Sequence, residues 1–227
     1  MKALVLAAGR GERLRPLTDH TPKPLLRVQD KPLIVWQLEA LARAGVTEVV
    51  VNLAHLGEQI EAALGDGREL GLRLQYSLEP PGALEAAGGI RLALPLMGDA
   101  PFILANADIW TDFDFAALPR EPCGLAHLVM VPNPEHHPHG DFCLENDCVA
   151  LHGASRMTYA GIAVYRPELF AGLEPGVRAP LAPLLREAIG NGAVSGIAFT
   201  GQWMDVGTQE RLELANQLAV ERNIKNQ

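Results

Sequence analysis

Residues 4–24 read LVLAAGRGERLRPLTDHTPKP and join an apolar run to a glycine-rich, basic segment. The apolar run 4–8 predicts a buried strand, and Gly9 and Gly11 predict a tight turn directly after it. Cationic side chains follow in the same segment: Arg10, Arg13, Arg15 and Lys23. Backbone N–H groups and cations gathered beyond a strand end predict a binding site for a polyanion.

Two familiar glycine loops do not fit this segment. A P-loop requires Lys-Ser or Lys-Thr after its last glycine, whereas Gly11 is followed by Glu12 and Arg13. A dinucleotide-binding turn requires a third small residue where this chain has Leu14, with Pro16 soon after. A nicotinamide-dependent oxidoreductase is therefore disfavoured. Gly-x-Gly alone leaves open an ordinary turn with solvated arginines.

Size and charge restrict the class of protein. A chain of 227 residues with 48% hydrophobic residues predicts one α/β domain, residues 1–227, with a sizeable core. The net charge of −8 argues against nucleic acid as a partner. Residues 1–31 hold seven basic and three acidic side chains, a local charge of +4, so the remainder carries −12. The N-terminal segment is thus a positive focus on an acidic body.

Alternating helices and strands in the first half predict a mostly parallel sheet. Strands are predicted at 47–53, 72–78 and 102–105, and helices at 33–44, 57–64 and 85–94. This alternation predicts a Rossmann-like α/β fold with three αβα layers. Ligands in such folds bind beyond the carboxyl ends of the strands, so the glycine loop and Asp108 are expected at the same edge.

The second half predicts a small antiparallel annex that makes the sheet mixed. Its strands are expected at 125–131 and 159–165, with a hairpin at 142–151 that turns at Asn146 and Asp147. The chain is then expected to finish with a helix at 181–189, a strand at 194–199, a loop at 203–208 and a helix at 208–223.

Cysteine spacing and hydropathy predict a cytoplasmic protein with no membrane partner. Cys123, Cys143 and Cys148 are odd in number and lack Cys-x-x-Cys spacing, which favours buried free thiols in a reducing compartment. The N-terminal apolar run is too short for a signal peptide, and no transmembrane run follows. A monomer and a homodimer both remain open.

The full spelling of the N-terminal segment carries a family resemblance. The segment reads Leu6-Ala7-Ala8-Gly9-x-Gly11-x-Arg13-Leu14-x-Pro16-Leu17-Thr18, followed by Thr21-Pro22-Lys23-Pro24-Leu25. It resembles the signature of the nucleotidyltransferases that act on sugar 1-phosphates. The resemblance implies that Arg13 holds the departing pyrophosphate and that Lys23 neutralises the reacting phosphates. It also implies a nucleoside triphosphate bound at Ala8, Gly9, Gly11, Glu12, Arg13, Lys23, Glu79 and Gly88.

Two carboxylates are candidate metal ligands. Nucleotidyl transfer needs a divalent cation, and Mg²⁺ is typically held by one or two carboxylates plus substrate oxygens. Asp108 ends a predicted strand, and Asp205 lies in Trp203-Met204-Asp205-Val206-Gly207-Thr208. Taken alone, an acid such as Asp205 before a helix is as well explained by the helix dipole. The family resemblance implies that both acids hold Mg²⁺, with Asp108 in a catalytic role.

Several positions resemble one branch of this family, the enzymes that join UTP to N-acetylmuramate 1-phosphate in cell-wall recycling. The usual Leu-Gly-Thr-Ala-Gly reads Leu84-Glu85-Ala86-Ala87-Gly88, and the usual glycine before the metal aspartate is Ala107. Glu85, Asn106, the run EHHPHGDF at 135–142 and the short chain match the branch. The resemblance implies sugar contacts from Asn106, Gly140 and Asp141.

Alternatives remain for this reading. Residues 135–142 are equally explained as a solvated polar loop, and zinc on His136, His137 and His139 is disfavoured because no partner stands at ligand spacing. A sibling enzyme that joins GTP to mannose 1-phosphate, or dTTP to glucose 1-phosphate, would share the catalytic residues. A non-catalytic nucleotide-sensing homologue would bind nucleotide without releasing pyrophosphate.

Overall fold

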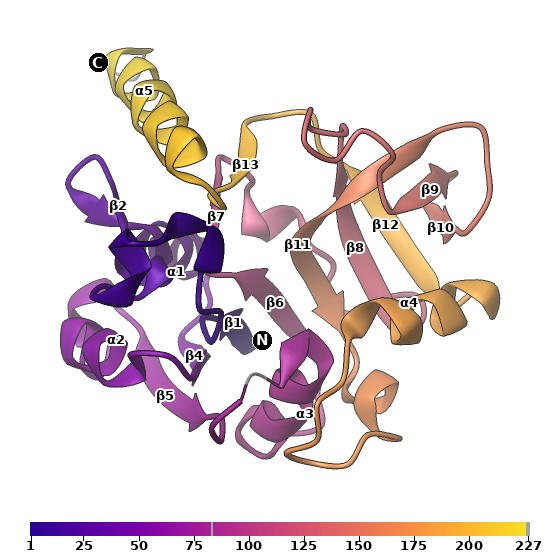
Figure 1. Cartoon of the computed structure of the whole chain (residues 1–227). Coiled ribbons are helices and arrows are strands. Elements are labelled where there is room, and N and C mark those ends of the chain that lie inside the picture. Colours follow the sequence, from indigo (N-terminus) through magenta and orange to yellow (C-terminus); the bar gives the residue numbers. More distant parts are fainter. Residues whose placement is uncertain (83, 226–227) are drawn as a thin grey trace.

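The computed structural model describes residues 1–82 and 84–225, with a nine-stranded sheet at its centre (Figure 1). The strand order is β5-β4-β1-β6-β11-β8-β12-β10-β9. The first four of these strands run parallel: β5 (Arg73–Leu78), β4 (Glu48–Leu53), β1 (Ala3–Leu6) and β6 (Phe102–Asn106). The parallel sheet predicted from the alternation of strands and helices is confirmed.

The remaining strands extend this sheet rather than forming a separate layer. β11 (Arg156–Tyr165) pairs antiparallel with both β6 and β8 (Ala126–Val131), and β12 (Val194–Ala198) runs parallel to β8. The hairpin of β9 (Phe142–Glu145) and β10 (Cys148–Ala150) completes the edge. Its turn residues Asn146 and Asp147 have φ of 48° and 63°, as a two-residue hairpin turn requires.

Helices cover both faces of the sheet, which confirms the three predicted layers (Figure 1). α1 (Leu33–Arg43) and α2 (Gly57–Leu64) pack on one face, and α3 (Glu85–Met97) and α4 (Leu181–Gly190) pack on the other. Successive strand residues point to opposite faces, so Val5 joins the cluster of α1 while Leu4 joins that of α3.

The C-terminal helix packs against the N-terminal segment. α5 (Gln209–Lys225) contributes Ala215 and Ala219 to a third cluster with Leu14, Val28 and Trp110. The short strands β2 (Arg27–Val28) and β3 (Lys31–Pro32) lie beside it, and the backbone N–H of Gln29 donates to Asn216 Oδ1 at 2.6 Å. Residues of the segment 14–33, which follows the glycine loop, therefore pack with residues of α5.

The structure adds a two-stranded ladder where the sequence predicted a loop. β13 (Trp203–Asp205) pairs antiparallel with β7 (Ile109–Thr111), so the expected loop at 203–208 was wrong in its first half. Three-residue strands are too short to show periodicity, and these two exist because tertiary packing brings them together. Short 3₁₀ helices occur at Glu12–Leu14, Leu17–Asp19, Lys23–Leu25, Arg68–Leu70, Phe115–Ala117 and Pro167–Phe170.

Smaller differences concern boundaries and thiols. β1 ends at Leu6, so Ala7 and Ala8 belong to the glycine loop. α3 continues through Pro95 to Met97, whose side chain is buried under the sheet. All three cysteines are free, but of them only Cys143 is buried; Cys123 lies in an exposed connection, and Cys148 is exposed at the start of β10. None of the helices in the described chain is long and apolar enough to cross a membrane.

Candidate active site

The glycine loop and Asp108 lie at the same edge of the sheet. β1 and β6 are parallel neighbours with Leu6 opposite Asn106, so the loop after one and the aspartate after the other leave the sheet together. The backbone N–H of Ala107 donates to the Leu6 carbonyl oxygen at 2.9 Å. This is the arrangement that parallel strands predicted for Gly9 and Asp108.

The glycine loop is fixed at one glycine and open at the other. Gly11 has φ of 69°, and an added Cβ would lie 3.0 Å from Thr18 Cγ2 and 3.1 Å from Lys23 Cβ. The Thr18 hydroxyl donates to the Gly11 carbonyl oxygen at 2.9 Å. An added Cβ at Gly9 would meet no atom within 4 Å. A side chain at Gly11 would therefore displace Lys23, whereas the backbone at Gly9 is accessible to a ligand.

Lys23 and Asp108 form an ion pair between these two segments. The Lys23 ammonium donates to Asp108 Oδ2, and the Lys23 side chain is only 10% exposed while that of Asp108 is 31% exposed. A lysine held this deeply needs an anionic partner. The pair therefore provides a cation whose charge is available to a phosphate once the carboxylate binds something else.

Asp205 is the second carboxylate at this edge. It lies opposite Ile109 in the β7–β13 ladder, and the backbone N–H of Val206 donates to the Asp108 carbonyl oxygen at 2.8 Å. Arg211 Nη1 donates to both oxygens of Asp205 at 2.6 Å, and His136 Nε2 lies 2.9 Å from Asp205 Oδ1. The ladder thus ties Asp205 to the segment that carries Asp108.

The two carboxylates fit a divalent cation in their donor chemistry. Asp108 and Asp205 line the same pocket, and each already holds a cationic side chain, Lys23 for one and Arg211 for the other. Two carboxylates with space for substrate oxygens are the usual protein contribution to a Mg²⁺ site. The described residues offer no cluster of three or more His, Cys, Asp or Glu for a metal, so further ligands would come from substrate and water.

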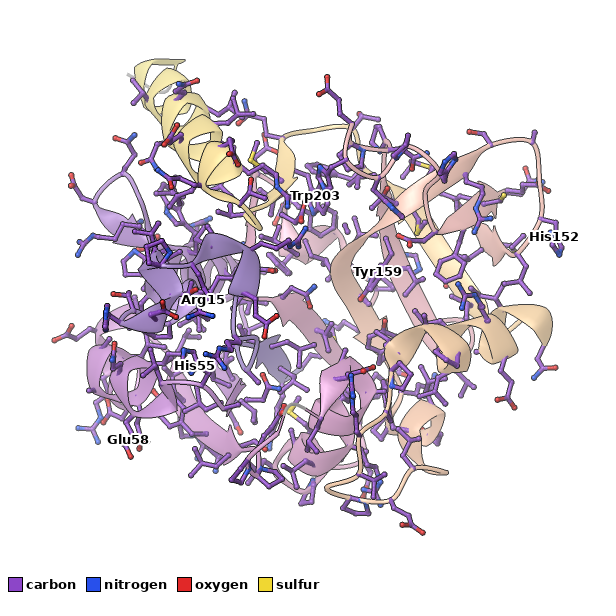
Figure 2. The ribbon with its side chains drawn as sticks, in the orientation of Figure 1. Arg15, His55, Glu58, His152, Tyr159 and Trp203 are labelled. Atoms are coloured by element: carbon purple, nitrogen blue, oxygen red, sulfur yellow. The ribbon has the colours of Figure 1, made fainter. Side chains whose placement is uncertain are left out.

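Two pockets meet at Asn106 and Asp108. One, of about 230 Å³, is lined by the glycine loop, Lys23 and Glu79. The other, of about 400 Å³, is lined by Arg13, Asp141 and Asp205, and by Tyr159 of β11 and Trp203 of β13, which are labelled in Figure 2. Asn106 and Asp108 line both pockets. The arrangement can hold two ligands whose reacting groups meet beside Asp108.

Glu79 is held in the smaller pocket by Asn52, a residue that the sequence analysis did not identify. The Ala7 N–H donates to Asn52 Oδ1 at 2.6 Å, which fixes the amide so that its Nδ2 donates to Glu79 Oε1 at 2.6 Å. The backbone N–H of Leu84 donates to the other oxygen of Glu79 at 3.1 Å. Burial raises the pKa of Glu79, against the opposing effect of these two donors.

Asn52→Ala is expected to lower the free energy of unfolding by about 1–3 kcal/mol. Asn52 is 3% exposed, and its loss leaves the buried Ala7 N–H without an acceptor and Glu79 Oε1 without the donor it has in the parent. Urea unfolding monitored by circular dichroism measures the change. Equal unfolding midpoints for the variant and the parent would contradict it.

Asn52→Asp tests the hydrogen bond to Glu79 separately from the hydrogen bond to the Ala7 N–H. The new carboxylate still accepts from Ala7 N–H but repels Glu79 and raises its pKa further. A carboxyl group whose pKa is raised by folding destabilises the protein above its unfolded pKa. The stability lost at neutral pH is therefore expected to return as the pH falls through the raised folded value. A stability difference from the parent that does not change with pH would count against this charge repulsion.

The other predicted site residues are distributed around these pockets. Glu12 lines a groove of about 520 Å³ that shares Ala8 and Glu79 with the smaller pocket. Asp141 lines the larger pocket, where its Oδ2 accepts from the Tyr159 N–H at 2.8 Å, and Gly140 directly precedes it with φ of 58°. His136 and His137 face different carboxylates, Asp205 and Asp141.

Gly88, one of the predicted nucleotide contacts, takes part in the packing of α3. It is buried in α3, and an added Cβ would lie 2.6 Å from the Val177 carbonyl oxygen and 3.1 Å from the Ala179 nitrogen. The lining of the smaller pocket does not include it. Its neighbour Gly89 is the glycine against Glu79, with an added Cβ 2.4 Å from Glu79 Oε1. Gly88 thus allows close packing of α3 on residues 177–179.

Arg211 is the other residue that sequence reasoning missed. It lies in α5, and its side chain is 12% exposed. An added Cβ at Gly207 would lie 2.4 Å from Arg211 Nη2 and 2.9 Å from Arg13 Nη2, so two guanidinium groups converge beside Gly207. The sequence contains no signal for this contact, because only the turn into α5 brings the side chains of Asp205 and Arg211 together.

Comparison with known proteins identifies the family of this chain. Residues 2–140 match the family model described as nucleotidyl transferase. An N-acetylmuramate alpha-1-phosphate uridylyltransferase of Neisseria meningitidis serogroup B is 52% identical over 96% of this chain and 98% of its own length. The protein of the same name from Caulobacter vibrioides is 36% identical over 90% of this chain and 91% of its own length.

More distant relatives share the fold. A mannose-1-phosphate guanylyltransferase catalytic subunit beta of Drosophila melanogaster is 32% identical over 91% of this chain, which spans 59% of that protein. A solved structure from Bacillus anthracis, a candidate glucose-1-phosphate thymidylyltransferase in complex with sucrose, superposes with a TM-score of 0.85. Its identity is 23%, and the match covers 96% of this chain and 95% of that one.

Proposed function

This chain belongs to the nucleotidyl transferase family, and we propose that it joins UTP to N-acetylmuramate 1-phosphate with release of pyrophosphate. The substrates follow the relative that is 52% identical over nearly the whole of both chains. The product would be a UDP-sugar for the recycling of cell-wall material. We further propose that residues 1–227 form one domain, because a single sheet contains strands from both halves of the chain.

In the proposed reaction, an oxygen of the sugar phosphate attacks the α-phosphorus of UTP in line. A new P–O bond forms as the bond to the β-phosphate oxygen breaks, and pyrophosphate leaves. No covalent enzyme intermediate is needed, because a phosphate monoester is itself a nucleophilic dianion. The protein contributes position and positive charge.

The proposed roles of the residues combine the family resemblance with the positions described above. Backbone N–H groups at Gly9 and Gly11 bind the triphosphate, and Arg13 holds the leaving pyrophosphate. Lys23 bridges the reacting phosphates when Asp108 releases it. Glu79 presents oxygens to the base from the smaller pocket, whose lining also includes Ala8. Asn106 and Asp141 contact the sugar from the larger pocket, with Gly140 shaping the turn beside them.

The family generally uses a divalent metal ion, and we assign it as Mg²⁺ held by Asp108 and Asp205. When bound, the ion neutralises phosphate charge and polarises phosphorus–oxygen bonds. The chain's own contribution is to hold the two carboxylates on one backbone ladder, so that the position of one fixes the other.

The observation that carries the proposal is that Asn106 and Asp108 line two adjoining pockets, with Lys23 paired to Asp108. A transferase that joins two phosphorylated substrates requires two binding sites that share a cationic, metal-binding junction. A sensing protein that binds one nucleotide needs only the first of these pockets.

Pyrophosphate release tests the proposal directly. UTP, dTTP, GTP, CTP and ATP would each be incubated with Mg²⁺ and with the 1-phosphates of N-acetylmuramate, glucose, mannose and N-acetylglucosamine. We expect release with UTP and N-acetylmuramate 1-phosphate, and its loss in Lys23→Ala. Release only with GTP and mannose 1-phosphate, or with dTTP and glucose 1-phosphate, would identify a sibling enzyme. Nucleotide binding without release from any pair would favour the sensing homologue.

A further inference from the structure

A third cavity adjoins the pocket assigned to the sugar phosphate. Its volume is about 300 Å³, and His137, Asp141 and Tyr159 line both spaces. Tyr159 lies on β11, above α4 in the view of Figure 2, and α4 supplies the opposite wall with Leu185 and Arg186. A sugar in the larger pocket can therefore extend a substituent into this third cavity.

Two arginines line the cavity without an acidic partner among the described side chains. Arg156 Nη2 donates to the backbone carbonyl oxygen of Asp141, and Arg156 makes no ion pair with any described side chain. Arg186 of α4 makes no side-chain hydrogen bond or ion pair with the described residues. On a chain with a net charge of −8, two such cations around one cavity point to an anionic ligand.

The carboxylate of Asp141, in the wall of the same cavity, already has a partner at each oxygen. Asp141 Oδ1 lies 3.1 Å from His137 Nε2, and its Oδ2 accepts from the Tyr159 N–H at 2.8 Å. Asp141 therefore faces partners of its own, and the two guanidinium groups remain available. A guanidinium binds a carboxylate through parallel N–H donors, which an ammonium group cannot match.

The remaining walls are apolar. Phe142 and Leu185 are 4% and 2% exposed, and Leu181 at the start of α4 is half-buried. Such walls suit a short aliphatic group beside the charge. The cavity therefore combines recognition of an acid with contact to a small apolar arm.

We propose that this cavity is a subsite for a carboxylate carried on a short aliphatic ether of the sugar, bound by Arg186 and Arg156. The inference rests on the proposed function. N-acetylmuramate carries such a group, a lactyl ether with one methyl and one carboxylate. The 1-phosphates of sugars without a carboxylate leave both arginines unpaired, so the subsite selects the acidic sugar.

The test compares the natural acid with its neutral amide in the parent and in Arg186→Ala. N-acetylmuramate 1-phosphate and the derivative with an amidated lactyl group are each assayed for kcat/KM with UTP. We expect the parent to prefer the acid about 10- to 100-fold. Arg186→Ala is expected to lose most of this preference by a lower kcat/KM for the acid alone, and Arg186→Lys to retain part of it.

The controls separate the subsite from general damage. Arg68→Ala removes an arginine whose side chain is 88% exposed and paired with Asp66, and it should leave the preference unchanged. Arg156→Ala should also lower the preference, but Arg156 supports the Asp141 backbone, so Arg186 is the cleaner variant. Equilibrium binding of free N-acetylmuramate, measured by nuclear magnetic resonance titration, should weaken in Arg186→Ala.

Two outcomes overturn the inference. One is an acid-to-amide ratio in Arg186→Ala equal to that of the parent. The other is a parent enzyme that releases pyrophosphate only with neutral sugars, in which case the transferase assignment stands and the acidic subsite fails. If no sugar 1-phosphate gave pyrophosphate release, by contrast, the proposed function itself would be wrong, and the subsite with it.

Discussion

Lys23→Ala is expected to lower kcat for pyrophosphate release by about 10²- to 10³-fold, the scale of one preorganised electrostatic group. Lys23 is the cation buried between the two pockets, and its ammonium contacts the carboxylate that both pockets share. Charge accumulates on the phosphates as the bond to pyrophosphate breaks, and without Lys23 that charge loses one of its fixed cations. Steady-state kinetics with UTP and N-acetylmuramate 1-phosphate provide the measurement.

The matched control is Lys31→Ala. Lys31 Nζ pairs with Glu39 Oε2 at 2.5 Å in the same part of the chain, and neither pocket is lined by it. This variant should keep the parental kcat within about twofold, as expected for a partly exposed ion pair away from the chemistry. Equal losses in the two variants would indicate damage to the N-terminal fold rather than to catalysis.

Folding should distinguish the two partners of the Lys23–Asp108 pair. Removal of Lys23 leaves Asp108 31% exposed and able to reach water. Removal of Asp108 leaves a lysine that is 10% exposed without its anion, which costs more. Asp108→Asn should therefore unfold at a lower temperature than Lys23→Ala. If Lys23→Ala were unfolded at room temperature, the loss of activity would give no evidence for a catalytic role of Lys23.

Asp205→Asn is expected to lower kcat by about 10²-fold and to raise the Mg²⁺ concentration that gives half-maximal activity. The substitution removes one of the two carboxylates assigned to the metal ion in the larger pocket and keeps the size of the side chain. Removal of divalent ions with a chelator should abolish activity in the parent, and added Mg²⁺ should restore it. Titration of Mn²⁺ by electron paramagnetic resonance, with UTP present, reports binding apart from turnover.

Asp66→Asn supplies the comparison for this prediction. Asp66 is 60% exposed and pairs with Arg68 far from either pocket, so its kcat and Mn²⁺ titration should match the parent. Thermal unfolding of Asp205→Asn should be measured as well, because Arg211 loses its carboxylate partner. Parental metal dependence in Asp205→Asn would mean that Asp108 holds the ion without it.

Local sequence carried much of the fold. The apolar run before Gly9, the bracketed helix at 33–44 and the Asn146-Asp147 turn each contain their own signal, because glycine, proline and periodic burial act over a few residues. The structure places each of these within a few residues of its predicted position. The glycine loop and Asp108 could be assigned to one edge because parallel strands share a direction.

Other parts of the site depend on contacts across long sequence separations. Asn52 reads as one residue of a β-strand, and only the pairing of β4 beside β1 brings its amide to Ala7 and Glu79. Arg211 reads as a surface residue of α5 until the β7–β13 ladder fixes Asp205 beneath it. Neither contact leaves a periodic trace in the chain.

Short patterns and chain direction were enough to predict the layers and the shared edge of the glycine loop and Asp108, whereas the two candidate metal carboxylates followed from the family resemblance. Long-range packing sets the contacts of Gly88 with residues 177–179 and of Gly89 with Glu79, and it brings Arg156 and Arg186 to one cavity. Which side chains share a cavity is set by how α4 packs on the sheet. That packing is a balance of many weak apolar contacts, which no single stretch of sequence contains.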